Sequence, residues 1–271
     1  MMEMPSQTGS RSRLWLLSAL FWAVVALGFV GWLARPPEER ELANFATSLR
    51  GRTPGQRHNA RLAARALDGI IIPPGGEFSF NQAVGPWTRD RGYKRAPVSF
   101  GGEMVITWGG GVCQVSSTLY NAALLAGMKI LERDHHTWAP LYVPPGRDAA
   151  VARGIADLRF ANPYSEPVRL EVEVRGETLI CRLYSRAQPT VEFRLVTEIK
   201  EVFPSSPLVR YDQDLPAGRR VRYAAGRLGC TVRTYRLILH NGRVVGQELL
   251  SDDEYKSLSP QVRVGTGIGG D

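Results

Sequence analysis

An uncharged run near the N-terminus limits how this chain can be built more than any other stretch. Residues 14–34 form 21 consecutive positions without Asp, Glu, Lys or Arg. As an α-helix they would span about 32 Å, enough for the roughly 30 Å hydrocarbon core of a bilayer. Arg11 and Arg13 precede the run, whereas an acidic segment follows Arg35. The positive-inside rule therefore predicts a single-pass transmembrane anchor over 14–34, with residues 1–13 in the cytoplasm.

A cleaved signal peptide is the competing explanation for this run. The apolar region of a signal peptide has about 7–15 residues and ends at a small-x-small cleavage site. Here the run is longer, and Trp32 stands where a small residue is needed before Ala34. Both explanations place the rest of the chain outside the cytoplasmic membrane. We predict a cell-membrane protein with the bulk of its chain extracytoplasmic.

Composition and pattern divide the remainder into two folded parts. The chain of 271 residues is 44% hydrophobic and 22% charged, which is ordinary for globular domains and excludes wholesale disorder. We expect a polar linker at 35–41, an α+β domain at 42–190 and an all-β module at 191–267. Pro189 lies at the boundary, where the pattern changes from mixed elements to strands alone.

Helices and strands are both expected in the first of these parts. Residues 42–67 are rich in Ala, Arg and Leu and predict a helix that is interrupted near 51–55. A second helix follows the glycines at 109–111, because apolar residues recur at helical steps from Val115 onward. The strands expected in this part lie at residues 137–143, 157–160, 168–174 and 178–184.

The second part is expected to contain strands alone. Asn241-Gly242 is the strongest two-residue hairpin signal in the chain. The strands expected there cover 191–196, 219–223, 231–239 and 244–250. These patterns predict an all-β module without a helix.

Arginine dominates the basic residues. The net charge is +8, and of the 34 Lys and Arg residues only Lys94, Lys129, Lys200 and Lys256 are lysine. Arginine favours phosphate and carboxylate partners, although the codon bias of a genome gives the same composition. We predict no nucleic-acid partner and no cofactor. Three cysteines are too few for a disulfide scaffold, and the pairing of Cys181 with Cys230 is left open.

Cys113 is the strongest candidate for chemistry. It follows three glycines and opens a helix, where free backbone N–H groups and the positive end of the dipole stabilise a thiolate. Its own N–H would point towards a developing oxyanion. The alternatives are a packed helix-start cysteine and a metal site shared with His136 and an aspartate. No metal-ligand spacing is present, and we predict no bound metal.

A cysteine nucleophile needs a base and a group that orients it. His135 and His136 are adjacent, so on a strand only one of them can face the cleft, and we choose His136 as the base. In a regular hairpin with its turn near 145–146, Asp157 would lie diagonally opposite His136. We therefore prefer Asp157 as the orienting residue, with Asp148 as the alternative. Gln114, Ser116 and Trp108 are predicted binding residues beside the thiol.

Long motifs in the first part point to a known family. They lie at 75–81, 84–86, 92–93, 96–97, 109–122, 132–133, 136, 142–144, 146–149 and 157–160. Together they resemble the VanW family, which is named after an accessory protein of bacterial glycopeptide-resistance clusters. The resemblance implies a cell-envelope role and supplies no activity. The order Cys113, His136, Asp also resembles transglutaminase-like proteins, a weaker analogy that implies a similar fold.

The last part resembles a G5 domain, a small β module named after five glycines. The matching positions are 214–218, Gly226, Gly229, 241–242 and 264–266. Such modules accompany cell-wall proteins, so the resemblance implies a peptidoglycan or amino-sugar ligand. One hypothesis is an enzyme that hydrolyses amides or transfers acyl groups on peptidoglycan. The other is a non-catalytic protein that binds the cell wall or serves as a scaffold.

Overall fold

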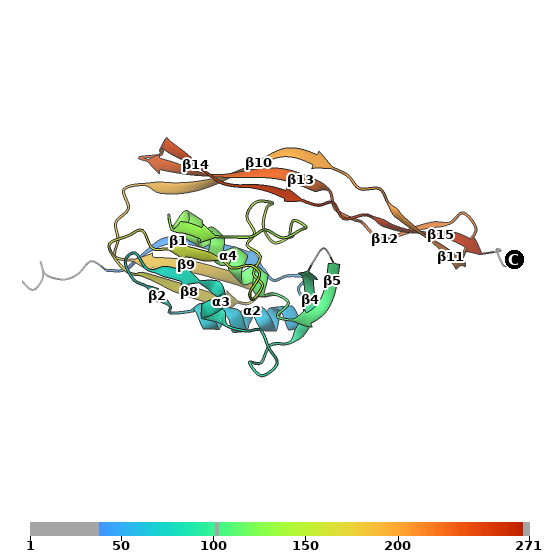
Figure 1. The fold of residues 1–271 in the computed structure, drawn as a ribbon, viewed down its shortest axis with the longest axis horizontal. Coiled ribbons are helices and arrows are strands. Elements are labelled where there is room, and N and C mark those ends of the chain that lie inside the picture. Colours follow the sequence, from blue (N-terminus) through green and yellow to red (C-terminus); the bar gives the residue numbers. More distant parts are fainter. Residues whose placement is uncertain (1–37, 101–102, 268–271) are drawn as a thin grey trace, which may run out of the picture. The chain divides into compact units, whose positions relative to one another are not determined.

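The computed structural model describes residues 38–100 and 103–267, which fold mainly as β-strands (Figure 1). Strands account for 49% and helices for 15%, so the expected α+β class is corrected to a mostly β fold. The predicted anchor at 14–34 lies outside the described residues. In the part that is described, no helix is long and apolar enough to cross a membrane. That finding gives no support to the predicted transmembrane helix or to the predicted single-pass membrane localisation.

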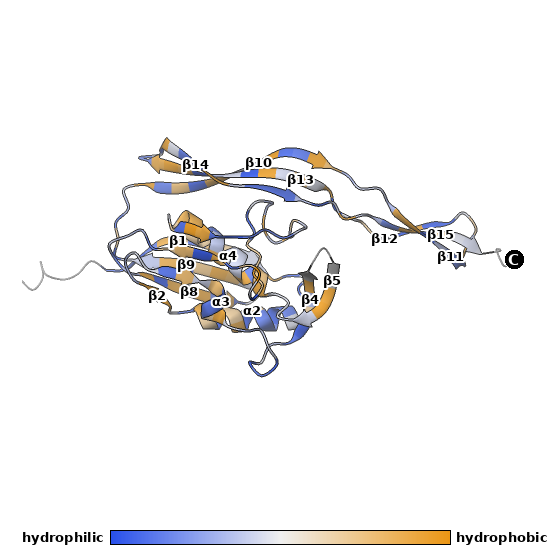
Figure 2. Ribbon diagram, in the orientation of Figure 1, coloured by the Kyte–Doolittle hydropathy of each residue, from blue (hydrophilic) through white to orange (hydrophobic). Residues whose placement is uncertain are grey.

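The first domain is built on a four-stranded antiparallel sheet with the order β1-β9-β8-β2. Along β8 and β9 every second residue is buried, including Leu170, Leu179 and Leu183, and Figure 2 shows the alternation of hydrophobic and hydrophilic positions. Helices α2 and α4 pack into the same core. The elements are β1 (Arg40–Ser48), α2 (Pro54–Leu67), β2 (Ile71–Ile72), α4 (Val112–Leu125), β8 (Val168–Arg175) and β9 (Thr178–Ser185).

The segment before α2 differs from its prediction. Residues 40–48 form strand β1 instead of a helix, and Phe45 pairs with Cys181 of β9. Pairing with a neighbouring strand is a tertiary contact, and it outweighs the local helix propensity of Ala and Leu. The helix begins only at Pro54, where the side chains of Thr53 and Gln56 form a capping box.

Smaller elements surround this sheet. A three-stranded sheet has the order β3-β7-β6, and β4 pairs with β5 in a separate hairpin. Their bounds are β3 (Glu77–Ser79), α3 (Phe80–Val84), β4 (Arg95–Phe100), β5 (Glu103–Trp108), β6 (Lys129–Glu132) and β7 (Arg159–Ala161). Helix α4 begins between the β4–β5 hairpin and the main sheet, so its N-terminus lies where loops can converge (Figure 1).

Residues 133–158, here called the 133–158 loop, do not form the predicted hairpin. They contain only the isolated bridges Asp134–Ala150 and Ala152–Ala156. The loop is held instead by bonds to α4, such as Ser116 Oγ to the Ala149 carbonyl at 2.6 Å, and by bonds to the second module, where Lys256 N donates to the Thr137 carbonyl at 2.8 Å. A register argument based on regular strand pairing therefore does not apply to this segment.

The second module contains strands alone, as predicted. Two three-stranded sheets have the orders β10-β13-β14 and β11-β15-β12. Asn241 and Gly242 both have positive φ, at 51° and 75°, which confirms the predicted tight hairpin. Strands β11 and β15 were not predicted. The bounds are β10 (Glu192–Phe203), β11 (Leu208–Pro216), β12 (Arg220–Ala224), β13 (Gly229–His240), β14 (Arg243–Tyr255) and β15 (Gln261–Gly267).

The core of the second module is small. Its buried cluster consists of Cys230, Val232 and Tyr255. Cys181 and Cys230 are free, buried thiols, so the disulfide that the sequence left open is not formed. From Glu39 onward, the described residues belong to one compact unit, and part of the burial at the end of β14 comes from the first domain.

Candidate active site

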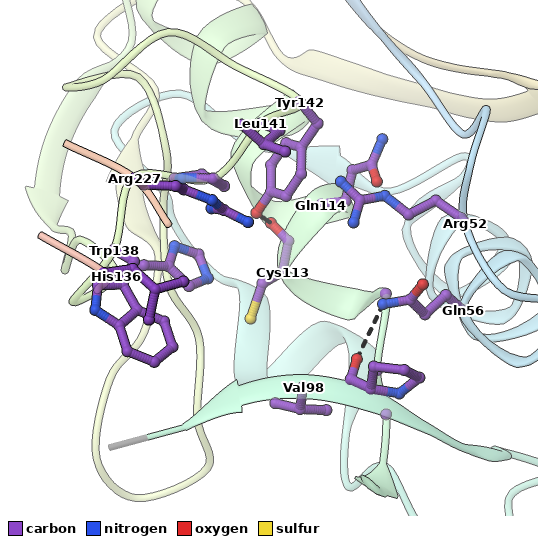
Figure 3. A pocket seen from close by; sticks show the side chains of 16 residues that line it. Arg52, Gln56, Val98, Cys113, Gln114, His136, Trp138, Leu141, Tyr142 and Arg227 are labelled. Carbon is purple, nitrogen blue, oxygen red and sulfur yellow. Dashed lines mark hydrogen bonds between the residues drawn. The ribbon is translucent and has the colours of Figure 1, made fainter. Parts of the chain in front are cut away.

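Cys113 is the second residue of α4, and its position depends on the glycines before it. Gly111 has a φ of 106°, and a Cβ there would collide with the Gln56 carbonyl oxygen. Only glycine fits this backbone, because an L side chain would be strained and would collide. The tight approach directs the start of α4 into a pocket, where the partly exposed Cys113 sulfur is visible in Figure 3.

His136 faces the same pocket and is held by Asp148. The Nδ1 atom of His136 lies 2.6 Å from Asp148 Oδ2, and the His136 backbone N–H donates to the same oxygen at 2.8 Å. This pair fixes the ring orientation and leaves Nε2 for the pocket side. In Figure 3 the imidazole and the thiol lie on the same side of the pocket.

The electrostatics of the three groups favour a charged pair. Burial by itself would raise the pKa of Cys113, but a hydrogen bond with His136 and its positive charge outweigh burial and lower the pKa. Burial would lower the pKa of His136, but its bonds to Asp148 and Cys113 raise it to about 10. The lowered pKa of Cys113 and the raised pKa of His136 both favour a thiolate–imidazolium pair, the reactive form of a cysteine.

Asp148 is completely buried and is neutralised by groups from two domains. Arg133 Nη2 lies 3.2 Å from Asp148 Oδ1, and the Tyr255 hydroxyl donates a short hydrogen bond to the same oxygen. Arg133 also bonds both oxygens of Asp253 at 2.7 Å. Burial raises the pKa of Asp148, yet bonds from His136 and charges of His136 and Arg133 lower it to about 2. Asp148 therefore stays ionised opposite His136.

Tyr255 and Asp253 belong to β14 and were missed by the sequence analysis. They follow Asp148 by more than a hundred positions, and no local pattern connects them. The Tyr255 hydroxyl also accepts a hydrogen bond from Gly146 N at 2.9 Å. The strand expected at 244–250 ends before Asp253 and Tyr255, so no sequence signal pointed to them. The end of the second module thus supports the orienting carboxylate of the first.

Asp157, the preferred orienting residue, lies elsewhere. Its carboxylate accepts bonds from Ser79 Oγ at 2.5 Å and from Asn81 N at 2.9 Å. It caps the start of α3 rather than contacting His136. The structure brings Asp148, the alternative, to His136, because the 133–158 loop is irregular and the expected strand register does not exist.

The three predicted binding residues lie in different surroundings. Gln114 lines the pocket, but its Nε2 donates to Thr47 Oγ1 at 3.1 Å and to the Ser48 carbonyl at 2.9 Å. Ser116 is completely buried and donates to the Ala149 carbonyl at 2.6 Å, so it has a structural role. Trp108 ends β5 and does not line the pocket.

The pocket is a cavity of about 160 Å³ beside Cys113. Its walls are aromatic and apolar, with Trp138, Leu141 and Tyr142 from the 133–158 loop, and two arginines also line it. The Tyr142 hydroxyl donates to the Cys113 carbonyl at 3.2 Å, which ties this wall to α4. In residues 38–100 and 103–267 no three His, Cys, Asp or Glu side chains are arranged as metal ligands.

The backbone N–H of Cys113 lies at the start of α4, beside two N–H groups that are hydrogen-bonded. The N–H groups of Val112 and Gln114 bond to the carbonyls of Gly109 and Gly111 at 3.0 and 3.2 Å. Among the described residues, the Cys113 N–H forms no such bond. A free N–H on the nucleophile residue itself, at the positive end of a helix, suits a developing oxyanion.

Comparison with known proteins identifies two domains in the chain. Residues 55–184 match the family model described as VanW like protein. The chain carries a VanW-like domain. Residues 195–267 match the G5 domain model, so a G5 domain follows it. This combination of domains suggests a cell-wall-associated function. Cys113, His136 and Asp148 all lie within the VanW-like domain, whereas Tyr255 lies within the G5 domain.

Two relatives match the VanW-like part. The chain is 44% identical over 146 residues to the uncharacterized protein YoaR of Bacillus subtilis, covering 54% of this chain and 48% of YoaR. It is 28% identical over 159 residues to the vancomycin B-type resistance protein VanW of Enterococcus faecalis, covering 56% of this chain and 58% of VanW. The chain thus spans about half the length of these relatives.

Two solved structures match the G5 part. An IgA1 protease G5 domain is 22% identical with a TM-score of 0.21, covering 30% of this chain and 95% of that one. The HP0197 G5 structure is 28% identical with a TM-score of 0.18, covering 28% and 96%.

Proposed function

We propose that the VanW-like domain is a cysteine-dependent acyltransferase or amidase that acts on peptidoglycan peptides. The observation that carries the proposal is the chain of contacts from Cys113 through His136 to Asp148, at a helix N-terminus and in a pocket. Nucleophile, base and orienting carboxylate are the components of a cysteine triad. The orienting residue in this proposal is Asp148.

The reaction follows from the resting charges. The Cys113 thiolate attacks the carbonyl carbon of an amide, and the oxyanion that forms accepts a hydrogen bond from the Cys113 N–H. The C–N bond breaks as the His136 imidazolium gives its proton to the leaving amine, which leaves a thioester on Cys113. Water or an acceptor amine, deprotonated by His136, then attacks the thioester and restores the thiolate and the imidazolium.

The peptidoglycan substrate is supported by the domain combination and by the relative named as a vancomycin resistance protein. The aromatic walls formed by Trp138 and Tyr142 suit a peptide backbone and small side chains. The alternative is cell-wall binding without catalysis, favoured by the exposed Tyr211 and Leu208 on β11 of the G5 domain.

Incubation of the purified protein with muropeptides, followed by liquid chromatography and mass spectrometry, tests this proposal. The wild-type protein should release an amine fragment and carry an acyl adduct on Cys113. Cys113→Ala and His136→Ala should abolish turnover, whereas Cys181→Ala, which removes a thiol of the first domain's core outside the pocket, should retain it. Full turnover by Cys113→Ala, or binding of muropeptides without any adduct or product, would favour the non-catalytic alternative.

A further inference from the structure

Two arginines without an acidic partner line the pocket beside Cys113. Arg52 lies in the turn between β1 and α2, and Arg227 lies between β12 and β13 of the G5 domain. In Figure 3 their guanidinium groups extend towards the centre of the pocket from opposite sides of Tyr142. They are close enough that the positive charge of Arg227 contributes to lowering the pKa of Arg52, after the larger effect of burial.

The surroundings hold both side chains without neutralising them. The Arg52 guanidinium lies 5.0 Å from the centre of the Tyr142 ring, and Arg227 Nη1 donates to the Ala139 carbonyl at 2.9 Å. Within the ranges that the structure covers, neither guanidinium forms a salt bridge. Arg57, near Arg52 in the sequence, and Arg133, nearby in the fold, both form salt bridges. Arg52 is half-buried and Arg227 is exposed, and two like charges that line one cavity repel each other unless an anion lies between them.

The position of the two arginines places a bound anion close to the reaction at Cys113. Tyr142 contacts both Arg52 and, through its hydroxyl, the Cys113 carbonyl. A pocket of about 160 Å³ admits only a short stretch of ligand, so an anion held by the arginines and the bond attacked by Cys113 belong to neighbouring residues. Guanidinium groups bind carboxylates bidentately, which fixes orientation as well as charge.

We propose that Arg52 and Arg227 form a carboxylate-binding subsite, so that the acyl donor is a peptide with a free carboxylate within about one residue of the scissile amide. This inference rests on the proposed function of Cys113. Because Arg227 belongs to the G5 domain, the substrate site is complete only when both domains are present. The G5 domain then contributes to substrate selection in addition to any binding of its own.

A matched pair of alkylating agents tests the subsite. Iodoacetate and iodoacetamide both form a carbon–sulfur bond with the Cys113 thiolate and release iodide, but only iodoacetate carries a carboxylate. The measured quantity is the ratio of their rates at Cys113, followed by peptide mass spectrometry. Arg52→Gln and Arg227→Gln should each lower this ratio about threefold to tenfold. Arg61→Gln, which removes an exposed charge on α2 away from the pocket, should leave the ratio unchanged.

The outcomes separate the subsite from the nucleophile. If iodoacetamide reacts fast but the iodoacetate to iodoacetamide rate ratio is the same in wild type and both arginine variants, the subsite is refuted. The assignment of Cys113 as the nucleophile is then unaffected. A slow iodoacetamide reaction in the folded wild-type protein overturns the proposed function and the subsite with it. Melting temperatures of the variants, compared with Arg61→Gln, exclude a loss of ratio caused by unfolding.

Competition experiments identify where the carboxylate comes from. A short acetylated stem-peptide fragment with a free C-terminal carboxylate and its C-terminal amide are compared as protectants of Cys113 against iodoacetamide. Better protection by the free acid, lost in Arg52→Gln, supports a terminal carboxylate. If a fragment with a side-chain carboxylate and an amidated C-terminus protects equally well, the carboxylate belongs to the side chain. Equal protection by fragments with and without any carboxylate contradicts the proposal.

Discussion

Replacing His136 tests the charged pair on which the proposed chemistry depends. An ordinary thiol with a pKa of 9.0 is only about 0.3% thiolate at about pH 6.5. A fully formed pair with His136 would raise the thiolate fraction about 300-fold. A thiolate of lower pKa is a weaker nucleophile, with a Brønsted coefficient of about 0.4–0.5, so the expected gain in alkylation rate is about twentyfold.

In His136→Ala the largest opposition to the burial of Cys113 is removed, and burial raises the pKa of the thiol. We therefore expect the iodoacetamide rate of Cys113 at about pH 6.5 to fall by at least about twentyfold. The rate should recover only as the pH rises above the pKa of an ordinary thiol. Cys181 serves as an internal reference, because its burial in the core raises its pKa and keeps it unreactive in the folded protein.

His58→Ala is the matched control for this experiment. His58 lies on α2, where its ring contacts the Gly92 carbonyl at 2.8 Å and does not line the pocket. Its replacement should leave the pH–rate profile of Cys113 unchanged. The reasoning is refuted if wild-type Cys113 reacts no faster than a free thiol at about pH 6.5, or if His136→Ala reacts as fast as wild type while remaining folded.

Three further expectations follow from the packing around the site. Tyr255→Phe removes the hydroxyl that donates to Asp148, so the Cys113 alkylation rate should fall several-fold and its pH midpoint should rise, with the melting temperature reporting any loss of fold. Gly111→Ala should destabilise the protein by about 2–4 kcal/mol in urea titration, because its Cβ meets the Gln56 carbonyl, whereas Gly176→Ala, with positive φ but open space, should cost only about 1 kcal/mol. The folded-state pKa of Asp148 is depressed to about 2, so its stabilisation is present above pH 3.8 and is lost as the pH falls through about 2; Asp148→Asn should therefore show a flatter dependence of stability on pH in this acid range.

The elements with a strong local pattern were predictable from the sequence. Helix α4 forms where its apolar period predicts a helix, although it is buried nearly all round. The β8–β9 hairpin has an apolar period that matches its burial, and Asn241-Gly242 forms the expected turn. The position of Cys113 at a helix start also followed from the three glycines before it. These features depend on interactions between residues close in the sequence, which a pattern can report.

The elements that depend on distant partners were not predictable. Residues 40–48 resemble a helix in composition, but β9 is available as a partner and they become a strand. The choice of Asp157 over Asp148 assumed regular pairing across 137–157. That segment forms only isolated bridges within itself, and its path also depends on contacts with the second module. A sequence pattern does not reveal these distant contacts.

The support of Asp148 shows why the site needs both domains. A buried carboxylate costs free energy unless its lone pairs and its charge are satisfied. The first domain supplies His136 and Arg133, but Arg133 is itself buried and requires Asp253 as a second counter-charge. Tyr255 completes the hydrogen bonding of Asp148. Movement of β14 away from the VanW-like domain would therefore remove bonds from Asp148 and Arg133 together and weaken the hold on His136. The reactivity of Cys113 is in this way coupled to the placement of the G5 domain.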